Sequence, residues 1–324
     1  MEGHRPKASN KAQNRVADQH AATTGRKIHP IVIYPYSHPR DPRHLEELYG
    51  KLLRGIASNP GKYAKPLTVV NQQTYHRNSE NPAFRKLLTD YVEPYSDILQ
   101  AWSVDTCQMW LHGFGTAFDA RQTVYDVYWL IPGDFFYADK AGQEVLQNFE
   151  GIPDVVYTGQ AEMCIGEIAV PPNSAKQLID TYGTYGLLYN WFPAEAQGLK
   201  TITEKPRSEF IAIGHDYLKT ALISQRWYAY EQTIVILLQG MQGVRPMRSI
   251  KKIPLGNLTD EPTGRNDLAG AMQQVERTER VLKLYWRELK GPQDPLWPEK
   301  FRVLDHQSEQ IRGAAMVILQ QILG

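Results

Sequence analysis

Short apolar runs alternate with segments of helical periodicity through the first half of this chain of 324 residues. The apolar runs are rich in β-branched and aromatic residues, as β-strands are. They are "IVIYPYS" (31–37), "PLTVVNQQT" (66–74), "SDILQAWSV" (96–104) and "VYWLIPGD" (127–134). The helical segments lie between them, at 42–58, 81–92 and 113–126. Strands that alternate with helices form βαβ units, so the sequence predicts an α/β fold with a mainly parallel central sheet flanked by helices.

The ends of three predicted strands carry residues that could contact a ligand. They are Pro35 to His38, Asn71 to Thr74, and Asp134. The carboxyl ends of parallel strands meet at one edge of a sheet, and ligands of such folds bind beyond that edge. We therefore expect these stretches, which are far apart in the sequence, to lie along one rim.

The second half of the chain is predicted as further strands and helices. A helix at 140–149 is followed by strands at 154–162 and 164–172, a helix at 173–183 and an aromatic segment at 182–197. Then come a strand, turn and helix start at 208–222, a helix at 228–243, a basic extended segment at 244–256 and an amphipathic helix at 266–289.

Charge and hydropathy exclude several classes of protein. The 36 basic and 35 acidic residues leave a net charge of +1, which would not steer the chain to nucleic acid. No apolar run approaches the roughly 18 residues of a membrane span, so no transmembrane segment is expected. Residues 1–28 are predicted to be a disordered basic leader, and they lack the apolar stretch that a secretory signal would have. Cys107 and Cys164 are too few for a disulfide framework, which favours a cytoplasmic setting, with a place at the membrane surface as the alternative.

The succession "IVIYPYS", "TVVNQQT", "GFGTAFDA", "YWLIPGD" and "YEQTIVILLQGMQGVRPMRSIKKIP" resembles a known family. In order and spacing, residues 30–256 are similar to nucleotide-sugar glycosyltransferases of the GT-A fold. The nearest types are the inverting enzymes of the dolichyl-phosphate mannose synthase and mannosylglycerate synthase kinds. The resemblance implies that a sugar is transferred from a nucleotide-diphosphate sugar to an acceptor hydroxyl, and that the anomeric configuration is inverted.

The resemblance also implies a set of nucleotide-binding residues. They are Pro35, Tyr36, Ser37, Asn71, Gly113 and Gly115. Tyr36 would stack on the base, and Asn71 stands where the family usually has an aspartate that binds the base. An asparagine side chain offers both a donor and an acceptor to a base edge. Phe114 stands between the two glycines, where the family often has a lysine near the diphosphate, and the glycines could alternatively serve only as a helix cap.

Asp134 falls where the family has its metal-binding pair of acids. The resemblance implies that Asp134 binds Mg²⁺ or Mn²⁺ together with the diphosphate, because these cations prefer carboxylate oxygen. Only one acid of the pair is in register in Pro132-Gly133-Asp134, and Asp139 follows five residues later. His215 is a second candidate metal ligand or phosphate contact. Alternatively, Asp134 is a turn residue and His215 an ordinary hydrogen-bonded histidine.

Glu231 is the candidate general base, since the family places an acid near the start of the corresponding helix. Acids are also common in a first helical turn because of the helix dipole. Trp191 and Tyr189 are the candidate acceptor-binding residues, within an aromatic group that packing of the core would explain equally well. That group is Tyr182, Tyr185, Tyr189, Trp191 and Phe192.

A cluster of four basic residues could supply the charge that Phe114 lacks, or form a solvated edge strand protected from aggregation by its lysines. They are Arg245, Arg248, Lys251 and Lys252. The acceptor could be a small molecule, a glycan or a lipid-linked sugar. The amphipathic helix at 266–289 is a candidate surface for a homo-oligomer.

The expected organisation is one domain in two halves with an extension. Residues 29–140 form the nucleotide-binding half, 141–258 the acceptor-binding half and 259–324 a C-terminal helical extension. Two other functions stay open: a GT-A-like binding protein that has lost catalysis, and a nucleotidyltransferase that makes activated sugars. The second would need a glycine-rich basic loop after the first strand, and "YPYSHPRD" contains no glycine.

Overall fold

The computed structural model describes most of the chain between residues 27 and 323. The described residues are 27–34, 51–78, 80–101, 113–117, 126–133, 135–136, 142–170, 174–224, 232–242, 250–256, 259–260 and 268–323.

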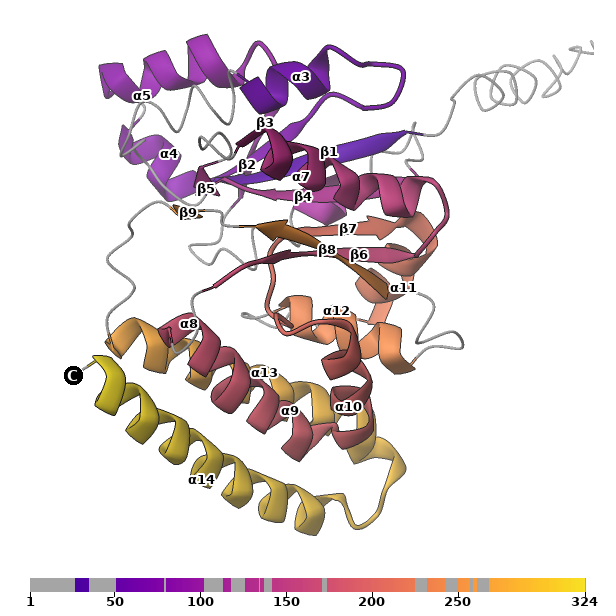
Figure 1. The fold of residues 1–324 in the computed structure, drawn as a ribbon, viewed down its shortest axis with the longest axis vertical. Helices are drawn as coiled ribbons and strands as arrows, with labels where there is room; N and C mark the ends of the chain where they lie inside the picture. Colours follow the sequence, from indigo (N-terminus) through magenta and orange to yellow (C-terminus); the bar gives the residue numbers. More distant parts are fainter. Residues whose placement is uncertain are drawn as a thin grey trace, which may run out of the picture.

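A seven-stranded sheet forms the centre of the molecule (Figure 1). Its strands are β1 (Ile28–Tyr34), β2 (Leu67–Asn71), β3 (Asp97–Ala101), β4 (Val127–Pro132), β6 (Met163–Ile168), β7 (Ile211–Gly214) and β8 (Ile250–Gly256). They lie in the order β3-β2-β1-β4-β7-β6-β8. β7 runs antiparallel to both β4 and β6, whereas the other neighbouring pairs are parallel. The predicted mainly parallel sheet is therefore confirmed, and the carboxyl ends of every strand except β7 share one edge, which we call the carboxyl edge.

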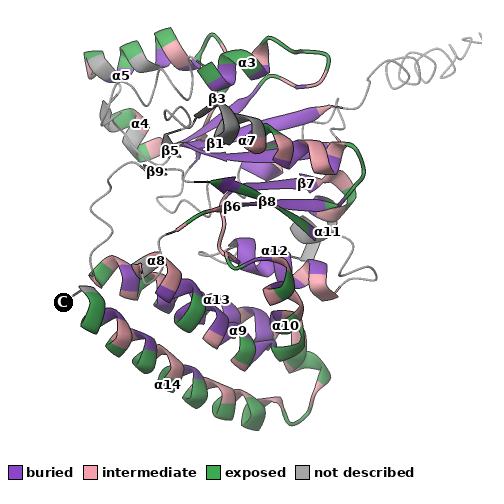
Figure 2. Ribbon diagram, viewed as in Figure 1, coloured by how far each residue is buried: buried purple, intermediate pink, exposed green. Residues whose placement is uncertain are grey.

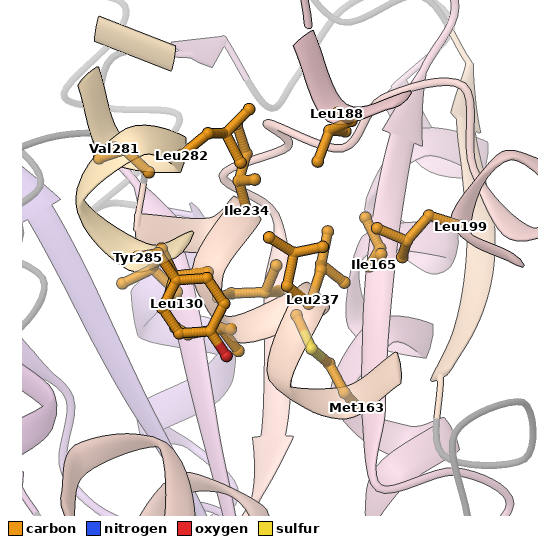
Figure 3. Close-up of a cluster of buried hydrophobic side chains, with 14 of the residues drawn as sticks. Leu130, Met163, Ile165, Leu188, Leu199, Ile234, Leu237, Val281, Leu282 and Tyr285 are labelled. Atoms are coloured by element: carbon orange, nitrogen blue, oxygen red, sulfur yellow. The ribbon is translucent and has the colours of Figure 1, made fainter. Parts of the chain in front are cut away.

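The central strands are apolar on both faces because helices cover both faces of the sheet. Every residue of β2 and of β4 is buried. On one face, Val32 and Trp129 pack with residues of α3 (Arg54–Ala57), α5 (Pro82–Leu87), η2 (Leu88–Val92) and α7 (Gly142–Tyr157). On the other face, side chains of β4 and β6 meet α9 (Tyr185–Trp191), α10 (Pro193–Ile202) and α12 (Gln232–Gln242). Figure 3 shows Leu130 and Met163 beside Leu237 of α12, and Figure 2 shows the central strands buried and the outer helices partly exposed.

The helix α7 corrects a prediction, because residues 154–162 do not form a strand. α7 continues beyond residue 149, where the predicted helix ends, to Tyr157, and it contains Pro153. Phe149, Ile152 and Val156 recur at helical spacing, and all three are buried against the sheet. This burial outweighs the strand preference of the run "DVVY". The chain then turns at Gly159, whose φ of 74° favours glycine.

Most other predicted elements are found close to their expected places. The first four strands, the helix at 81–92 and the strand–turn–helix at 208–222 are present, the last as β7 and α11 (His215–Ser224). The strand predicted to reach residue 74 ends at Asn71, and α4 (Gln72–Asn78) follows directly. The aromatic segment folds as α9 and α10, after α8 (Ala175–Leu178) and η3 (Ile179–Thr184). Two further short strands, β5 (Phe135–Phe136) and β9 (Thr259–Asp260), pair with each other.

The C-terminal helical extension is also confirmed. α13 (Leu268–Lys290) and α14 (Trp297–Leu323) are joined through η4 (Gly291–Gln293) and pack against each other and against α9 (Figure 1). A polar cluster fastens the three helices together. Glu279 is 3% exposed and accepts hydrogen bonds or ion pairs from Ser308 Oγ (2.9 Å), Lys283 Nζ (2.9 Å) and Arg312 Nε (3.2 Å). Ser308 in turn accepts a hydrogen bond from Trp191 Nε1 at 3.2 Å.

We predict that Glu279→Ala lowers the free energy of unfolding by about 3 kcal/mol, because removing one partner of a buried ion pair leaves the other charges uncompensated. Urea unfolding would measure the loss. The control is Glu80→Ala, which breaks the exposed ion pair of Glu80 with Arg85 and should cost less than about 1 kcal/mol. Equal losses in the two variants would show that the buried cluster does not hold the extension in place.

Candidate functional site

The carboxyl edge brings together the ends of β1, β2 and β4, as the sequence predicted. The backbone N–H of Gly133 donates to the carbonyl of Ile33 at 2.7 Å, so the ends of β4 and β1 lie side by side. Asn71 ends the neighbouring strand β2, is 5% exposed and pairs in register with Ala101 of β3. The predicted ligand residues that follow β1 and β4, namely Pro35, Tyr36, Ser37 and Asp134, lie outside the described residues, as do Asp139 and Glu231.

The two glycines of the predicted turn have different surroundings. Residues 113–117 form a helical segment that packs on the sheet. A Cβ at Gly113 would lie 2.8 Å from Ile31 Cγ2 and 3.0 Å from Val69 Cγ2, so packing on β1 and β2 accounts for this glycine. Among the described residues, no atom lies within 4 Å of a Cβ placed at Gly115. Of the two, only Gly115 therefore leaves space in which a ligand could approach the backbone.

Phe114 is a core residue, with a side chain only 1% exposed. The position at which the GT-A family often has a lysine thus faces the interior of the protein in this chain. A charged side chain would lose its hydration there, which explains the phenylalanine in terms of packing.

His215 is not at the carboxyl edge, and its prediction as a metal ligand alongside Asp134 is wrong. It directly follows β7, which runs antiparallel to β4, so Gly214 pairs with Val127 at the amino end of β4. Its backbone N–H donates to the carbonyl of Asp126, and its Nδ1 lies 3.3 Å from the Tyr128 hydroxyl. β4 is about 16 Å long at the usual rise per residue, so His215 lies about that far from the carboxyl end of this strand. This geometry supports the alternative interpretation, in which His215 is an ordinary hydrogen-bonded histidine.

Of the two predicted acceptor residues, Trp191 proves to be part of the core. Its ring is 2% exposed and packs against Trp286 and Phe301, with ring centroids 5.9 and 5.4 Å away. It therefore offers no face on which a sugar could stack. Tyr189 is 43% exposed and Tyr182 is 49% exposed, so these two rings are accessible.

A cavity of about 400 Å³ opens at the other half of the carboxyl edge, and we call it the edge pocket. Its polar lining comes from the end of β6, from α8 and η3, and from the loop before β7. The polar side chains that line it are Glu167, Gln177, Asp180, Thr181, Glu204 and Lys205. The wall is completed by Ile168 of β6, by Ala169 and Val170 after it, and by Pro254 and Gly256 of β8. Sequence reasoning placed these residues in the acceptor-binding half but did not single out any of them.

Ion pairs fix the side chains of the edge pocket. Asp180 is 5% exposed and accepts hydrogen bonds from Lys205 Nζ at 3.0 Å and Arg207 Nε at 3.1 Å. Arg207 also donates to Gln274 Oε1 of α13 at 2.9 Å, which links the pocket to the C-terminal extension. Glu204 is paired with Lys200.

Glu167 holds the rim of the pocket in the same way. One carboxylate oxygen accepts the backbone N–H of Glu204 at 2.8 Å, and the other lies 2.8 Å from Lys252 Nζ. Lys251 donates to Gln160 at 3.3 Å. Lys251 and Lys252 are predicted either to supply positive charge near the diphosphate or to protect an edge strand. Both lie on β8, which is an edge strand of the sheet. Arg245 and Arg248 fall outside the described residues.

Burial shifts the pKa of two groups close to this region. The hydroxyl of Tyr185 donates to the carbonyl of Thr203 at 2.5 Å, and burial, with Glu204 and Asp180 nearby, raises its pKa well above the usual value. Burial likewise raises the pKa of the Cys164 thiol to about 12, so this cysteine of β6 is a core residue and not a nucleophile.

Within the described ranges, no three His, Cys, Asp or Glu side chains are grouped so that they could hold a metal ion. None of the helices described is both long enough and apolar enough to span a bilayer.

We predict that Gly113→Ala destabilises the protein by about 1–3 kcal/mol, because the added methyl group overpacks two stiff β-branched side chains. Gly115→Ala is the matched control in the same helical segment and should be neutral or stabilising by up to about 1 kcal/mol. Urea unfolding of both variants measures the difference. If both changes were equally tolerated, the packing explanation of Gly113 would be refuted.

The comparisons with known proteins identify a fold. No protein-family model and no curated protein matches the chain. Among solved structures, glucosyl-3-phosphoglycerate synthase from Mycobacterium tuberculosis is similar. Its complex with Mn²⁺, UDP and glucosyl-3-phosphoglycerate has a TM-score of 0.53 at 12% identity, and the match covers 87% of this chain and 86% of that one. Its complex with Mn²⁺, UDP-glucose and glycerol 3-phosphate has a TM-score of 0.53 at 13% identity, with 86% of each chain covered.

A third structure of that enzyme, with phosphoglyceric acid, gives a TM-score of 0.52 at 12% identity over 86% of each chain. Similarity at this level of identity concerns the fold. The mainly parallel sheet, the antiparallel β7 and the helical extension agree with it. This chain therefore has a GT-A fold, in a sequence that has diverged far from the glycosyltransferase structures it resembles.

Proposed function

We propose that the protein is a glycosyltransferase that moves a sugar from a nucleotide-diphosphate sugar to an acceptor hydroxyl, with inversion at the anomeric carbon. The observation that carries the proposal is the arrangement of the carboxyl edge. The ends of β1, β2 and β4 adjoin at one half of this edge, and the edge pocket opens at the half formed by β6 and β8. A donor and an acceptor could thus be bound on one edge of one sheet, as a two-substrate transfer requires.

The donor half would hold the nucleotide. In this proposal Pro35, Tyr36 and Ser37 follow β1 and meet the base, and Asn71 hydrogen-bonds the base edge. Asp134 directly follows Gly133 and lies toward the diphosphate. The similar solved structures include complexes with UDP-glucose and Mn²⁺, which supports a nucleotide sugar as donor and a divalent cation as its companion. Mg²⁺ or Mn²⁺ at Asp134 would neutralise the phosphate charge.

The chemical step would be a single displacement. The acceptor hydroxyl oxygen forms a bond to the anomeric carbon, and the bond from that carbon to the diphosphate breaks. The diphosphate leaves with the electron pair, and the hydroxyl proton passes to the carboxylate of Glu231. Glu231 immediately precedes α12, whose residues Thr233 to Leu238 are buried. A firmly packed helix of this kind would fix the position of a base at its start.

A second candidate function is a nucleotide-sugar or glycan-binding protein without catalysis. The observation in its favour is the burial of Phe114, which is 1% exposed where the family often has a lysine. The two functions share the binding step and differ in turnover.

We expect a UDP-, GDP- or dTDP-sugar to raise the melting temperature in the presence of Mn²⁺. A ligand at about 100 times its Kd adds roughly 2.7 kcal/mol to the free energy of unfolding. Asp134→Ala should abolish the dependence of this shift on Mn²⁺. The control Asp97→Ala removes an exposed aspartate at the start of β3, at the opposite edge, and should keep it. The proposal fails if no nucleotide sugar shifts the melting temperature with or without metal.

Glu231→Gln separates catalysis from binding. As a general base, Glu231 should contribute roughly 10²- to 10⁴-fold to kcat, so the variant should lose that factor while the thermal shift with the nucleotide sugar persists. Release of the nucleoside diphosphate, measured over a range of acceptors, provides the rate. Wild-type protein that binds the donor but transfers nothing to any acceptor would favour the non-catalytic function, and unchanged turnover in Glu231→Gln would rule out this base.

A further inference from the structure

The edge pocket is a cavity in the described part of the chain, and the side chains that line it indicate which class of ligand it could bind. It has a volume of about 400 Å³, and its polar side chains are held in place by ion pairs. We propose that it binds a neutral, hydroxyl-rich acceptor, of the size of a simple sugar or polyol, in preference to an anionic or a cationic one. This inference rests on the proposed function, because it names the acceptor class for the second half of the carboxyl edge.

The charges that line the pocket disfavour an anion. Three carboxylates, those of Glu167, Asp180 and Glu204, line it together with one ammonium group, that of Lys205. A phosphate or carboxylate group is an acceptor only and would lie among like charges. The Lys205 ammonium is 3.0 Å from Asp180, so its charge is already compensated.

The cations around the pocket are compensated as well. Lys252 lies 2.8 Å from Glu167, Arg207 is 3.1 Å from Asp180, and Lys200 is paired with Glu204. Each acid of the lining is thus matched by at least one cation. A cationic ligand would therefore have to compete with lysine or arginine for these carboxylates. The four cations against three carboxylates give the pocket with its immediate partners a charge of +1, which further disfavours a cationic ligand, while the lining itself carries three carboxylates against Lys205 alone.

Hydroxyl groups match the hydrogen-bonding capacity that is left. A carboxylate has about four lone-pair sites, and the contacts of Glu167 and Asp180 described above use two on each. The Lys205 ammonium has three protons, of which one points to Asp180. Thr181 adds a hydroxyl group that both donates and accepts. A hydroxyl is itself both donor and acceptor, so a polyol can satisfy carboxylates and ammonium together.

Sugars that differ only in charge provide the test. D-Glucose, D-glucuronate and D-glucosamine have the same ring and are neutral, negative and positive at neutral pH; galactose with its acid and amine, and myo-inositol, widen the set. Binding to the full-length protein is measured by saturation-transfer NMR, without any donor. We expect at least one neutral compound to bind at least tenfold more tightly than its charged counterparts. Binding of no neutral compound, or tighter binding of an acid or amine, overturns the inference.

A variant assigns the binding to the edge pocket. Thr181 lines the pocket and is exposed, so Thr181→Trp should fill the opening and reduce binding of the neutral sugar at least tenfold without unfolding the protein. Thr89→Trp places the same side chain at another exposed site, in η2, and should have no effect. Sugar binding that survives Thr181→Trp would place the ligand elsewhere and overturn the inference.

The same set of neutral and charged sugars tests this inference separately from the proposed function. The sugar-binding assay needs no nucleotide, so it can succeed in a protein that transfers nothing. If donor turnover is found and glucuronate is the better acceptor by kcat/KM, the transferase proposal stands and the neutral-acceptor inference falls.

Discussion

The parallel pairing of β1 with β2 and with β4 is the constraint on which the rest of the molecule depends. Ile33 pairs in register with both Val69 and Pro132, and the N–H of Gly133 closes the end of the ladder on the Ile33 carbonyl. These strands are buried, so a slip in register by one residue would exchange the residues of the two faces. The register therefore fixes which residues end the strands together. It places the end of β1, Asn71 and Gly133 on one edge, and it is the reason that the carboxyl edge exists.

The C-terminal extension supports the second half of that edge. Arg207 joins Asp180 of the edge pocket to Gln274 of α13, and Glu279 of α13 holds α14 through Ser308 and Arg312. The pocket wall and the helical hairpin are thus linked by buried polar contacts, which need specific partners and geometry. The extension is in this view part of the site's framework.

The sequence predicted the sheet well because its central strands are buried on both faces and read as apolar runs. It failed at 154–162, where Val155 and Val156 suggested a strand although the spacing of Phe149, Ile152 and Val156 is helical. It failed at His215 because residue patterns do not show the direction of a strand, and the reversal of β7 moves this histidine to the opposite edge.

Tertiary packing limited the prediction of the site as well. Trp191 was predicted either to contact an acceptor or to pack in the core. The local sequence does not show that α13 and α14 pack over it, so it could not decide between the two. The edge pocket was missed since its polar residues come from segments up to 38 positions apart, from Glu167 to Lys205.

The most direct test of the whole account is a crystal structure with the nucleoside diphosphate that stabilises the protein, in the presence of Mn²⁺. We predict electron density for the nucleoside diphosphate beside Asn71 and Gly133 at the carboxyl edge. Density for it at the amino edge, beside His215 and Tyr128, would contradict the proposed donor site.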